Sequence, residues 1–120
     1  MPPNSPDSAP RALRNLLDNL PEDLSEEQFA EVCHLGNGSV RIERIVSHGQ
    51  ASPEGFWYDQ DEDEWILILS GAARLRIEDV VEPVNLIPGD SVLLPAHCRH
   101  RIDWTTLEKP TVWLAVFTQA

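Results

Sequence analysis

Cysteine and positive charge are both scarce in this sequence. Only two cysteines occur, Cys33 and Cys98, and they lie far apart without the C-x-x-C spacing of redox or zinc motifs. Nine Lys and Arg residues stand against twenty Asp and Glu residues, which gives a net charge of −11 at pH 7. Binding to a nucleic-acid backbone needs clustered positive charge. We therefore expect two reduced thiols and no nucleic-acid partner.

Long apolar runs are also lacking. No stretch approaches the roughly 18 consecutive apolar residues of a membrane helix. The first seven residues (MPPNSPD) have neither the basic start nor the apolar middle of a signal peptide. These two absences predict a cytoplasmic protein that has no membrane partner.

The composition that remains is that of one folded domain. The chain has 120 residues, of which 42% are hydrophobic, and it includes four tryptophans. A chain of this size buries one core of ordinary dimensions. Changes in residue pattern divide it into a disordered tail at residues 1–9, a helical segment at residues 10–37 and a β-rich barrel at residues 38–120.

Two short α-helices are predicted in the N-terminal segment. The first follows Pro10, has four leucines at helical spacing and stops at Pro21. The second starts at Ser25, where Gln28 three residues later completes a capping-box pattern, and Gly36 suits its C-terminal end. Both helices are expected to pack against the main body of the protein.

After Gly38 the apolar residues alternate as they do in β-strands. Gly, Pro and Asp separate short strand segments near residues 39–48, 55–59, 64–70, 72–78, 83–87, 91–94, 99–103 and 111–118. Many short strands at close spacing predict a sandwich or a barrel. Gly71 is expected at a hairpin bend, and Pro88-Gly89 fits the centre of a type II turn after which a strand begins at Ser91.

Two spaced motifs add a family resemblance. The first is Glu64 followed after six residues by Gly71, and the second is Gly89 followed by Pro95 and His100. This spacing resembles the two motifs of the cupin superfamily, G-x5-H-x-H-x(3,4)-E-x6-G and G-x5-P-x-G-x2-H-x3-N. The match spans about residues 40 to 118, and small single-domain cupins are the nearest in pattern.

Several motif positions differ from the family pattern. Tyr58 and Gln60 stand where the first motif has its two histidines, and Ser52 stands at its leading glycine. In the second motif His97 replaces the glycine and Trp104 replaces the asparagine. Spacing is therefore kept better than residue identity.

The resemblance implies an all-β double-stranded β-helix, which is a jelly-roll barrel with a metal ion in its mouth. It implies Tyr58, Gln60, Glu64 and His100 as the metal ligands. A Gln carbonyl is a hard oxygen donor, and Tyr can bind a metal as phenolate, although its pKa is ordinarily near 10. Such a set suits a divalent Fe, Mn, Ni or Zn ion, bound more weakly than by three imidazoles and a carboxylate.

Other residues are candidates for the pocket wall. His97 lies in the same turn as His100, Trp57 precedes the expected ligands, and His48 ends a strand segment. The same positions also fit a solvent-facing loop histidine or a core aromatic. The last segment, residues 111–118, is apolar on both faces, so we expect cover from the N-terminal helices or from a second subunit in a homodimer.

Two functions from different classes remain open. The first is a metal-binding small cupin of unassigned activity. The second is a metal-free barrel that binds or senses a small organic molecule, with Tyr58, Gln60 and His100 as hydrogen-bonding groups. A purely structural dimer module is a third possibility, and a pocket packed solid with side chains would favour it. The sequence assigns neither a substrate nor a reaction.

Overall fold

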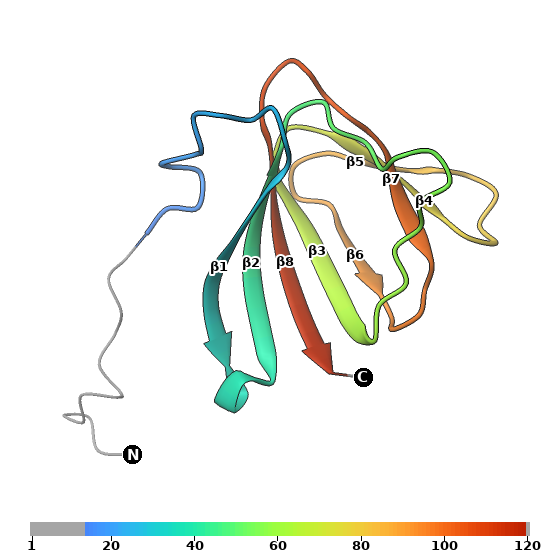
Figure 1. The fold of residues 1–120 in the computed structure, drawn as a ribbon, viewed down its shortest axis with the longest axis horizontal. Helices are drawn as coiled ribbons and strands as arrows, with labels where there is room; N and C mark the ends of the chain where they lie inside the picture. The colour runs from blue at the N-terminus through green and yellow to red at the C-terminus, as the bar shows by residue number, and fades with distance from the viewer. Residues whose placement is uncertain (1–13, 120) are drawn as a thin grey trace.

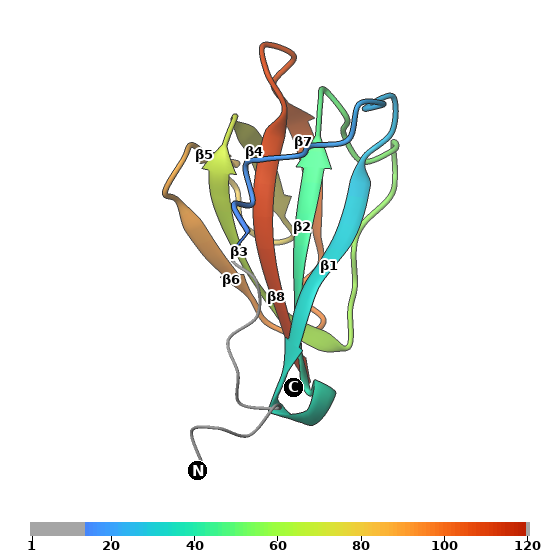
Figure 2. The same ribbon diagram turned by 90° about the vertical axis from the view of Figure 1, so that its left-hand side faces the viewer.

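The computed structural model describes residues 14–119, which form two antiparallel β-sheets (Figure 1). The larger sheet has the strand order β1-β2-β8-β3-β6, and the smaller has the order β5-β4-β7. Figure 2 shows β1, β2 and β8 side by side in front of β4 and β7. The elements are β1 (Gln28–Leu35), the short 3-10 turn η2 (Gly36–Gly38), β2 (Val40–Ser47), β3 (Glu62–Ser70), β4 (Ala73–Ile77), β5 (Val84–Leu86), β6 (Ser91–Leu94), β7 (His100–Thr105) and β8 (Thr111–Gln119).

The core lies between the sheets and follows directly from strand alternation. In β4, Ala73 and Leu75 are buried while Arg74 and Arg76 are exposed, because successive side chains of a strand point to opposite faces. The strands β3 and β8 alternate in the same way. The buried cluster that results draws on both sheets and comprises Ile45, Ile66, Ile68, Ala73, Leu75, Leu86, Leu94, Trp113, Ala115 and Phe117.

The β-rich region agrees well with the sequence prediction. The segment predicted at residues 91–94 is β6 itself, and Asp90 N–H donates to the Ile87 carbonyl at 2.9 Å across the preceding turn, in which Gly89 has φ +95°. The segment predicted at 55–59 is not a strand, since only Tyr58 pairs there, in an isolated bridge with His100. In place of the predicted strand there is therefore a single pair of backbone hydrogen bonds between Tyr58 and His100.

Gly71 does not sit in a hairpin. It lies at a corner where the chain leaves β3 in the larger sheet and enters β4 in the smaller one. Its φ is +87°, a left-handed conformation that favours glycine. A Cβ atom on Gly71 would stand 2.5 Å from the Cα of Thr111, so the corner also requires a residue without a side chain.

The two predicted N-terminal helices are wrong for the part of the chain that the structure describes. Residues 14–20 form turns, and residues 28–35 form β1, while residues 10–13 of the first helix and the predicted tail at residues 1–9 lie outside the described residues. The described residues contain no helix long and apolar enough to cross a membrane.

The physical reason for the missing helices lies in long-range contacts. The backbone of β1 pairs with β2 from Gln28↔Val46 to Leu35↔Val40, and this pairing overrides the helical spacing of its apolar residues. Ser25 does not begin a capping box, because its N–H and hydroxyl both donate to Asp23 Oδ1 at 3.0 and 2.7 Å. The guanidinium of Arg44 donates to the carbonyl of Asp18 at 2.9 Å, which a helix would use internally.

Candidate functional site

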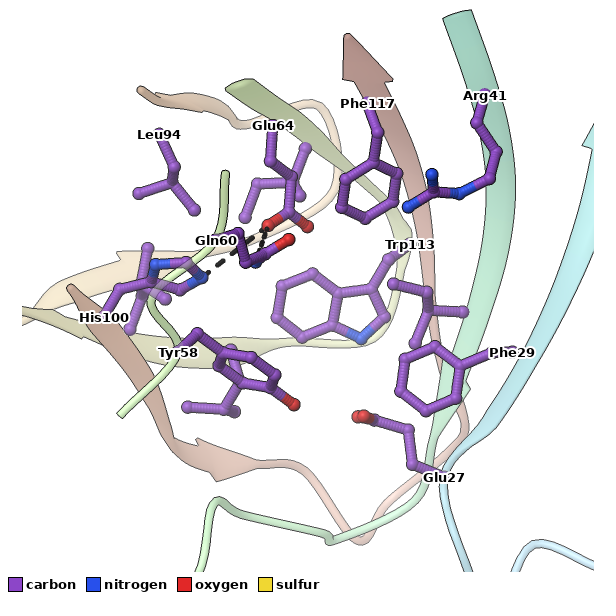
Figure 3. Close-up of a pocket in the computed structure, with 14 residues that line it drawn as sticks. Glu27, Phe29, Arg41, Tyr58, Gln60, Glu64, Leu94, His100, Trp113 and Phe117 are labelled. Atoms are coloured by element: carbon purple, nitrogen blue, oxygen red, sulfur yellow. Dashed lines mark hydrogen bonds and ion pairs between the residues drawn. The ribbon is translucent and has the colours of Figure 1, made fainter. Parts of the chain in front are cut away.

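A cavity of about 340 Å³ opens between the two sheets (Figure 3). Most of its wall is apolar, and a few polar side chains converge on it, which is the usual character of a small-molecule site. The lining residues are Glu27, Phe29, Arg41, Ile45, Tyr58, Gln60, Glu64, Ile66, Leu75, Leu94, His100, Ile102, Trp113 and Phe117.

Glu64 and His100 are the buried polar centre of this cavity. Glu64 lies near the start of β3 and His100 is the first residue of β7, with 7% and 5% of their surfaces exposed. His100 is held in place through its backbone, which exchanges two hydrogen bonds with Tyr58 at 2.7 and 3.2 Å. The two side chains face each other, with His100 Nε2 3.6 Å from Glu64 Oε1.

The hydrogen bond of His100 to Cys98 determines which ring nitrogen carries the proton and which one faces Glu64. Its Nδ1 lies 2.8 Å from the carbonyl of Cys98, and a carbonyl can only accept, so Nδ1 carries the proton. Burial lowers the pKa of His100, and the neutral ring therefore turns the lone pair of Nε2 toward Glu64. Burial also raises the pKa of the Glu64 carboxyl, against the opposing hydrogen bond from Gln60. The pair thus presents hydrogen-bond acceptors to the cavity.

Gln60 and Tyr58 complete the polar wall in different ways. The Gln60 amide donates from Nε2 to Glu64 Oε1 at 3.0 Å. The Tyr58 ring stacks on the His100 ring with centroids 5.3 Å apart and an interplanar angle of 21°. Its hydroxyl is directed toward Glu27 (Figure 3). Burial raises the pKa of Tyr58, and the charges of Glu27 and Glu64 raise it further, so the neutral phenol is favoured.

The family resemblance implies four metal ligands, and two of them, Gln60 and Tyr58, are oriented differently from Glu64 and His100. The described residues contain no group of three or more His, Cys, Asp or Glu side chains placed to hold a metal ion. Gln60 presents its N–H rather than its carbonyl to Glu64, and the Tyr58 hydroxyl points away from it. Transition-metal sites ordinarily use three or four protein ligands. Only Glu64 and His100 have the required orientation, and metal binding by all four residues stays a prediction.

The three further pocket candidates do not line the cavity. His48 Nε2 is 3.0 Å from the Leu107 carbonyl. Trp57 lies beneath the Arg99 guanidinium, which is 5.6 Å from the center of its ring. His97 has 63% of its side chain exposed and pairs with Asp59 at 2.7 Å. Each of these side chains is held by a local partner outside the cavity, which the motif spacing does not reveal.

Two charged residues of the cavity were missed by sequence reasoning. Glu27 precedes β1, and its Oε2 accepts a hydrogen bond from the Ser47 hydroxyl at 2.6 Å. Arg41 lies on β2 and donates to both carboxylate oxygens of Glu62 at 3.1 Å and to Glu43 at 2.8 Å. Both reach the cavity through the pairing of β1 with β2 and of β2 with β8, which no local motif signals.

Comparison with known proteins agrees with this geometry. The family model described as "Cupin domain" matches residues 43–117. The chain belongs to the cupin family. The match excludes β1 and Glu27, so part of this cupin's cavity wall comes from outside the family domain. No curated protein matches the chain.

Two solved structures share this fold. A crystal structure from Ralstonia eutropha JMP134, described as a "putative mannose-6-phosphate isomerase", is 44% identical with a TM-score of 0.85, and the match covers 92% of this chain and 100% of that one. A cupin superfamily protein from Desulfitobacterium hafniense DCB-2 is 18% identical with a TM-score of 0.70, over 92% and 94% of the two chains. The second likeness shows the fold alone.

Proposed function

We propose that the cavity of this cupin binds a small organic molecule directly, without a metal ion between the ligand and the protein. Glu64, His100 and Gln60 hold the polar end of the ligand, and the apolar walls hold its body. The observation that carries the proposal is the buried Glu64–His100 pair, whose atoms Oε1 and Nε2 face one cavity at 3.6 Å. Both side chains keep acceptor positions directed at the cavity, and a donor group of a ligand there would complete their hydrogen bonding.

The chemistry of these groups selects the polar end of the ligand. A carboxylate and the Nε2 of a neutral imidazole accept hydrogen bonds. The Nδ1 proton of His100 and the amide N–H of Gln60 are already directed to Cys98 and Glu64. The ligand therefore carries a hydrogen-bond donor, such as a hydroxyl or an amine, at the end that enters the cavity.

The description of the Ralstonia eutropha protein suggests a phosphorylated sugar as the substrate of that protein. We do not propose a phosphorylated sugar as the ligand of this chain. A phosphate group is recognised by guanidinium or ammonium groups that are free to bind it. Arg41 is the cationic side chain of the cavity, and Glu43 and Glu62 already occupy three of its N–H groups. Its positive charge is thus already shared by two carboxylates, which repel a phosphate that approaches the two remaining N–H groups.

A metal-binding cupin is the second candidate. The anchoring of His100 Nδ1 on the Cys98 carbonyl favours it, because metal-binding histidines usually donate their second N–H in this way. Two donors about 2.1 Å from one tetrahedral ion lie about 3.4 Å apart, close to the spacing of the Glu64–His100 pair. Fe, Mn, Ni or Zn would then need further ligands from solvent or substrate.

Thermal unfolding with three phenyl-bearing probes tests the leading proposal. Benzylamine, benzyl alcohol and benzoate share one aromatic body and differ in charge. We expect at least one of them to raise the melting temperature of the wild-type protein, because a ligand that binds only the folded state stabilises it. The Ile102→Trp variant replaces an aliphatic side chain of the cavity wall with a bulky indole ring and is expected to lose this response. No shift with any probe, or equal shifts in both proteins, would overturn the proposal.

A further inference from the structure

We propose that the ligand of this cavity is an organic cation, such as a small protonated amine with an apolar body. This inference rests on the proposed function and names the ligand class for the same site. Three independent features of the cavity carry it: the balance of its charges, the position of Glu27 and the aromatic side chains around it.

The net charge of the side chains that line the cavity is negative. Its titratable lining residues are Glu27, Arg41, Tyr58, Glu64 and His100. Arg41 is bound by the carboxylates of Glu43 and Glu62, and its guanidinium lies 4.3 Å from the center of the Phe117 ring. Its positive charge is therefore already compensated. Glu27 and Glu64 have no such cationic partner among residues 14–119.

Glu27 is positioned to receive the ligand's charge. Its Oε2 accepts a hydrogen bond from the Ser47 hydroxyl at 2.6 Å, and the Ser47 oxygen accepts one from Trp113 Nε1–H at 3.1 Å. This chain fixes the carboxylate at the cavity wall. Within the described residues, Oε1 of Glu27 has no hydrogen-bond partner. Figure 3 shows the carboxylate turned inward, near the Tyr58 hydroxyl and Phe29.

Aromatic side chains surround the same space. Phe29, Tyr58, Trp113 and Phe117 all line the cavity. The faces of such rings carry negative electrostatic potential and attract ammonium groups, most strongly in the case of tryptophan. A carboxylate beside aromatic rings therefore suits a protonated amine better than a neutral or anionic group. The net charge of −11 also attracts cations to the protein from solution.

Part of the preference for a cation comes from residues outside the family domain. Glu27 and Phe29 come from the segment around the start of β1, whereas the family match begins at residue 43. The pairing of β1 with β2 brings these two side chains to the cavity. A change confined to this segment can therefore alter the choice of ligand without changing the Glu64–His100 pair.

Isothermal titration calorimetry with the same three phenyl-bearing probes at pH 7 tests the inference. We expect the wild-type protein to bind benzylammonium at least about tenfold more tightly than benzyl alcohol, because a hydrogen bond to a charged group has a free energy of that order. Benzoate should bind most weakly. Glu27→Gln should reduce the preference for the amine about tenfold, whereas Glu22→Gln, which removes the same charge from an exposed position outside the cavity, should leave it unchanged.

The outcomes separate this inference from the proposed function. Equal or tighter binding of benzyl alcohol or benzoate overturns the cation preference and leaves the organic-ligand site standing. Unchanged amine preference in Glu27→Gln also overturns the inference, because Glu27 is its anchor. Absence of binding by all three probes overturns the proposed function, and the cation preference with it. If Glu27→Gln does not fold, the order of the three probes on the wild-type protein decides alone.

Discussion

Glu64 and His100 face each other across the cavity, with Oε1 and Nε2 3.6 Å apart and both side chains buried. Burial lowers the pKa of His100 and so favours its neutral ring, whereas the Gln60 N–H that donates to Glu64 Oε1 opposes the rise that burial causes in the pKa of that carboxyl. The distance is too long for a direct hydrogen bond. The two acceptors therefore lie ready for a donor group that enters the cavity, which is the basis of the proposed ligand site.

We predict that Glu27→Gln makes the protein more stable at neutral pH. Burial raises the folded-state pKa of Glu27 above 4.5, so its stabilising contribution is complete below pH 4.5 and is lost as the pH rises through the folded value. Glutamine has no charge to bury, and its carbonyl can still accept the hydrogen bond from Ser47. Urea unfolding of both proteins, from below pH 4.5 to neutral pH, measures the difference between their free energies of unfolding.

The pH dependence of this difference provides its control. The stabilising contribution of Glu64, like that of Glu27, is lost as the pH rises, because its folded-state pKa is raised. The contribution of His100 changes in the opposite direction: stability is lost as the pH falls below its ordinary pKa of 6.5, because its folded-state pKa is lowered. Both groups are present in wild type and variant, so their contributions cancel in the difference. A variant that is less stable than wild type at pH 7 would contradict a buried charge at Glu27.

We predict that Gly71→Ala destabilises the protein far more than Gly89→Ala. Both glycines have left-handed φ values, +87° and +95°, so both variants carry a backbone cost of about 1 to 2 kcal/mol. A Cβ at Gly71 would also collide with Thr111, whereas nothing lies within 4 Å of one at Gly89. We expect a total loss of about 3 kcal/mol or more for Gly71→Ala. Equal free energies of unfolding in the two variants would rule out the tight corner.

We predict that Arg44→Met releases the segment before β1. Arg44 is 7% exposed, and its guanidinium donates to the carbonyls of Leu16 and Asp18 at 3.3 and 2.9 Å. Its Nε has no hydrogen-bond partner among the described residues, so the cation is buried at a cost in free energy. Because removal of the cation also removes this cost, we expect the free energy of unfolding to change by less than about 1 kcal/mol. Amide hydrogen exchange should accelerate in residues 14–20.

Arg74→Met is the matched control for this release. Arg74 is an exposed arginine of the smaller sheet, and it donates to Asn85 at 3.0 Å. Its substitution should leave exchange in residues 14–20 unchanged. Unchanged exchange in Arg44→Met as well would show that the segment is held by other contacts.

The strands that the sequence predicted correctly are those with local signals. The Pro88-Gly89 turn fixes the start of β6, and alternating side chains define β4. The strand β1 was missed because it is an edge strand with Phe29 and Leu35 exposed, and its apolar spacing imitates a helix. Its conformation depends on backbone pairing with β2, which is a long-range contact.

The candidate site was predicted in part for the same reason. Motif spacing identified Glu64 and His100, and both line the cavity together with Tyr58 and Gln60. The direction of the Gln60 amide and of the Tyr58 hydroxyl depends on neighbours that the spacing does not specify. Glu27 reaches the cavity only because its segment leads into β1 at the edge of the larger sheet.

Calorimetric titration of benzylamine into chelator-treated protein of measured metal content tests the metal-free cavity most directly. Wild-type protein purified without a metal-affinity tag is incubated with EDTA and dialysed, and its transition-metal content is determined by mass spectrometry. We predict a metal content far below one equivalent and a benzylamine affinity equal to that of the untreated protein. Loss of binding after EDTA, with recovery on addition of Fe, Mn, Ni or Zn, would contradict direct binding by Glu64, His100 and Glu27.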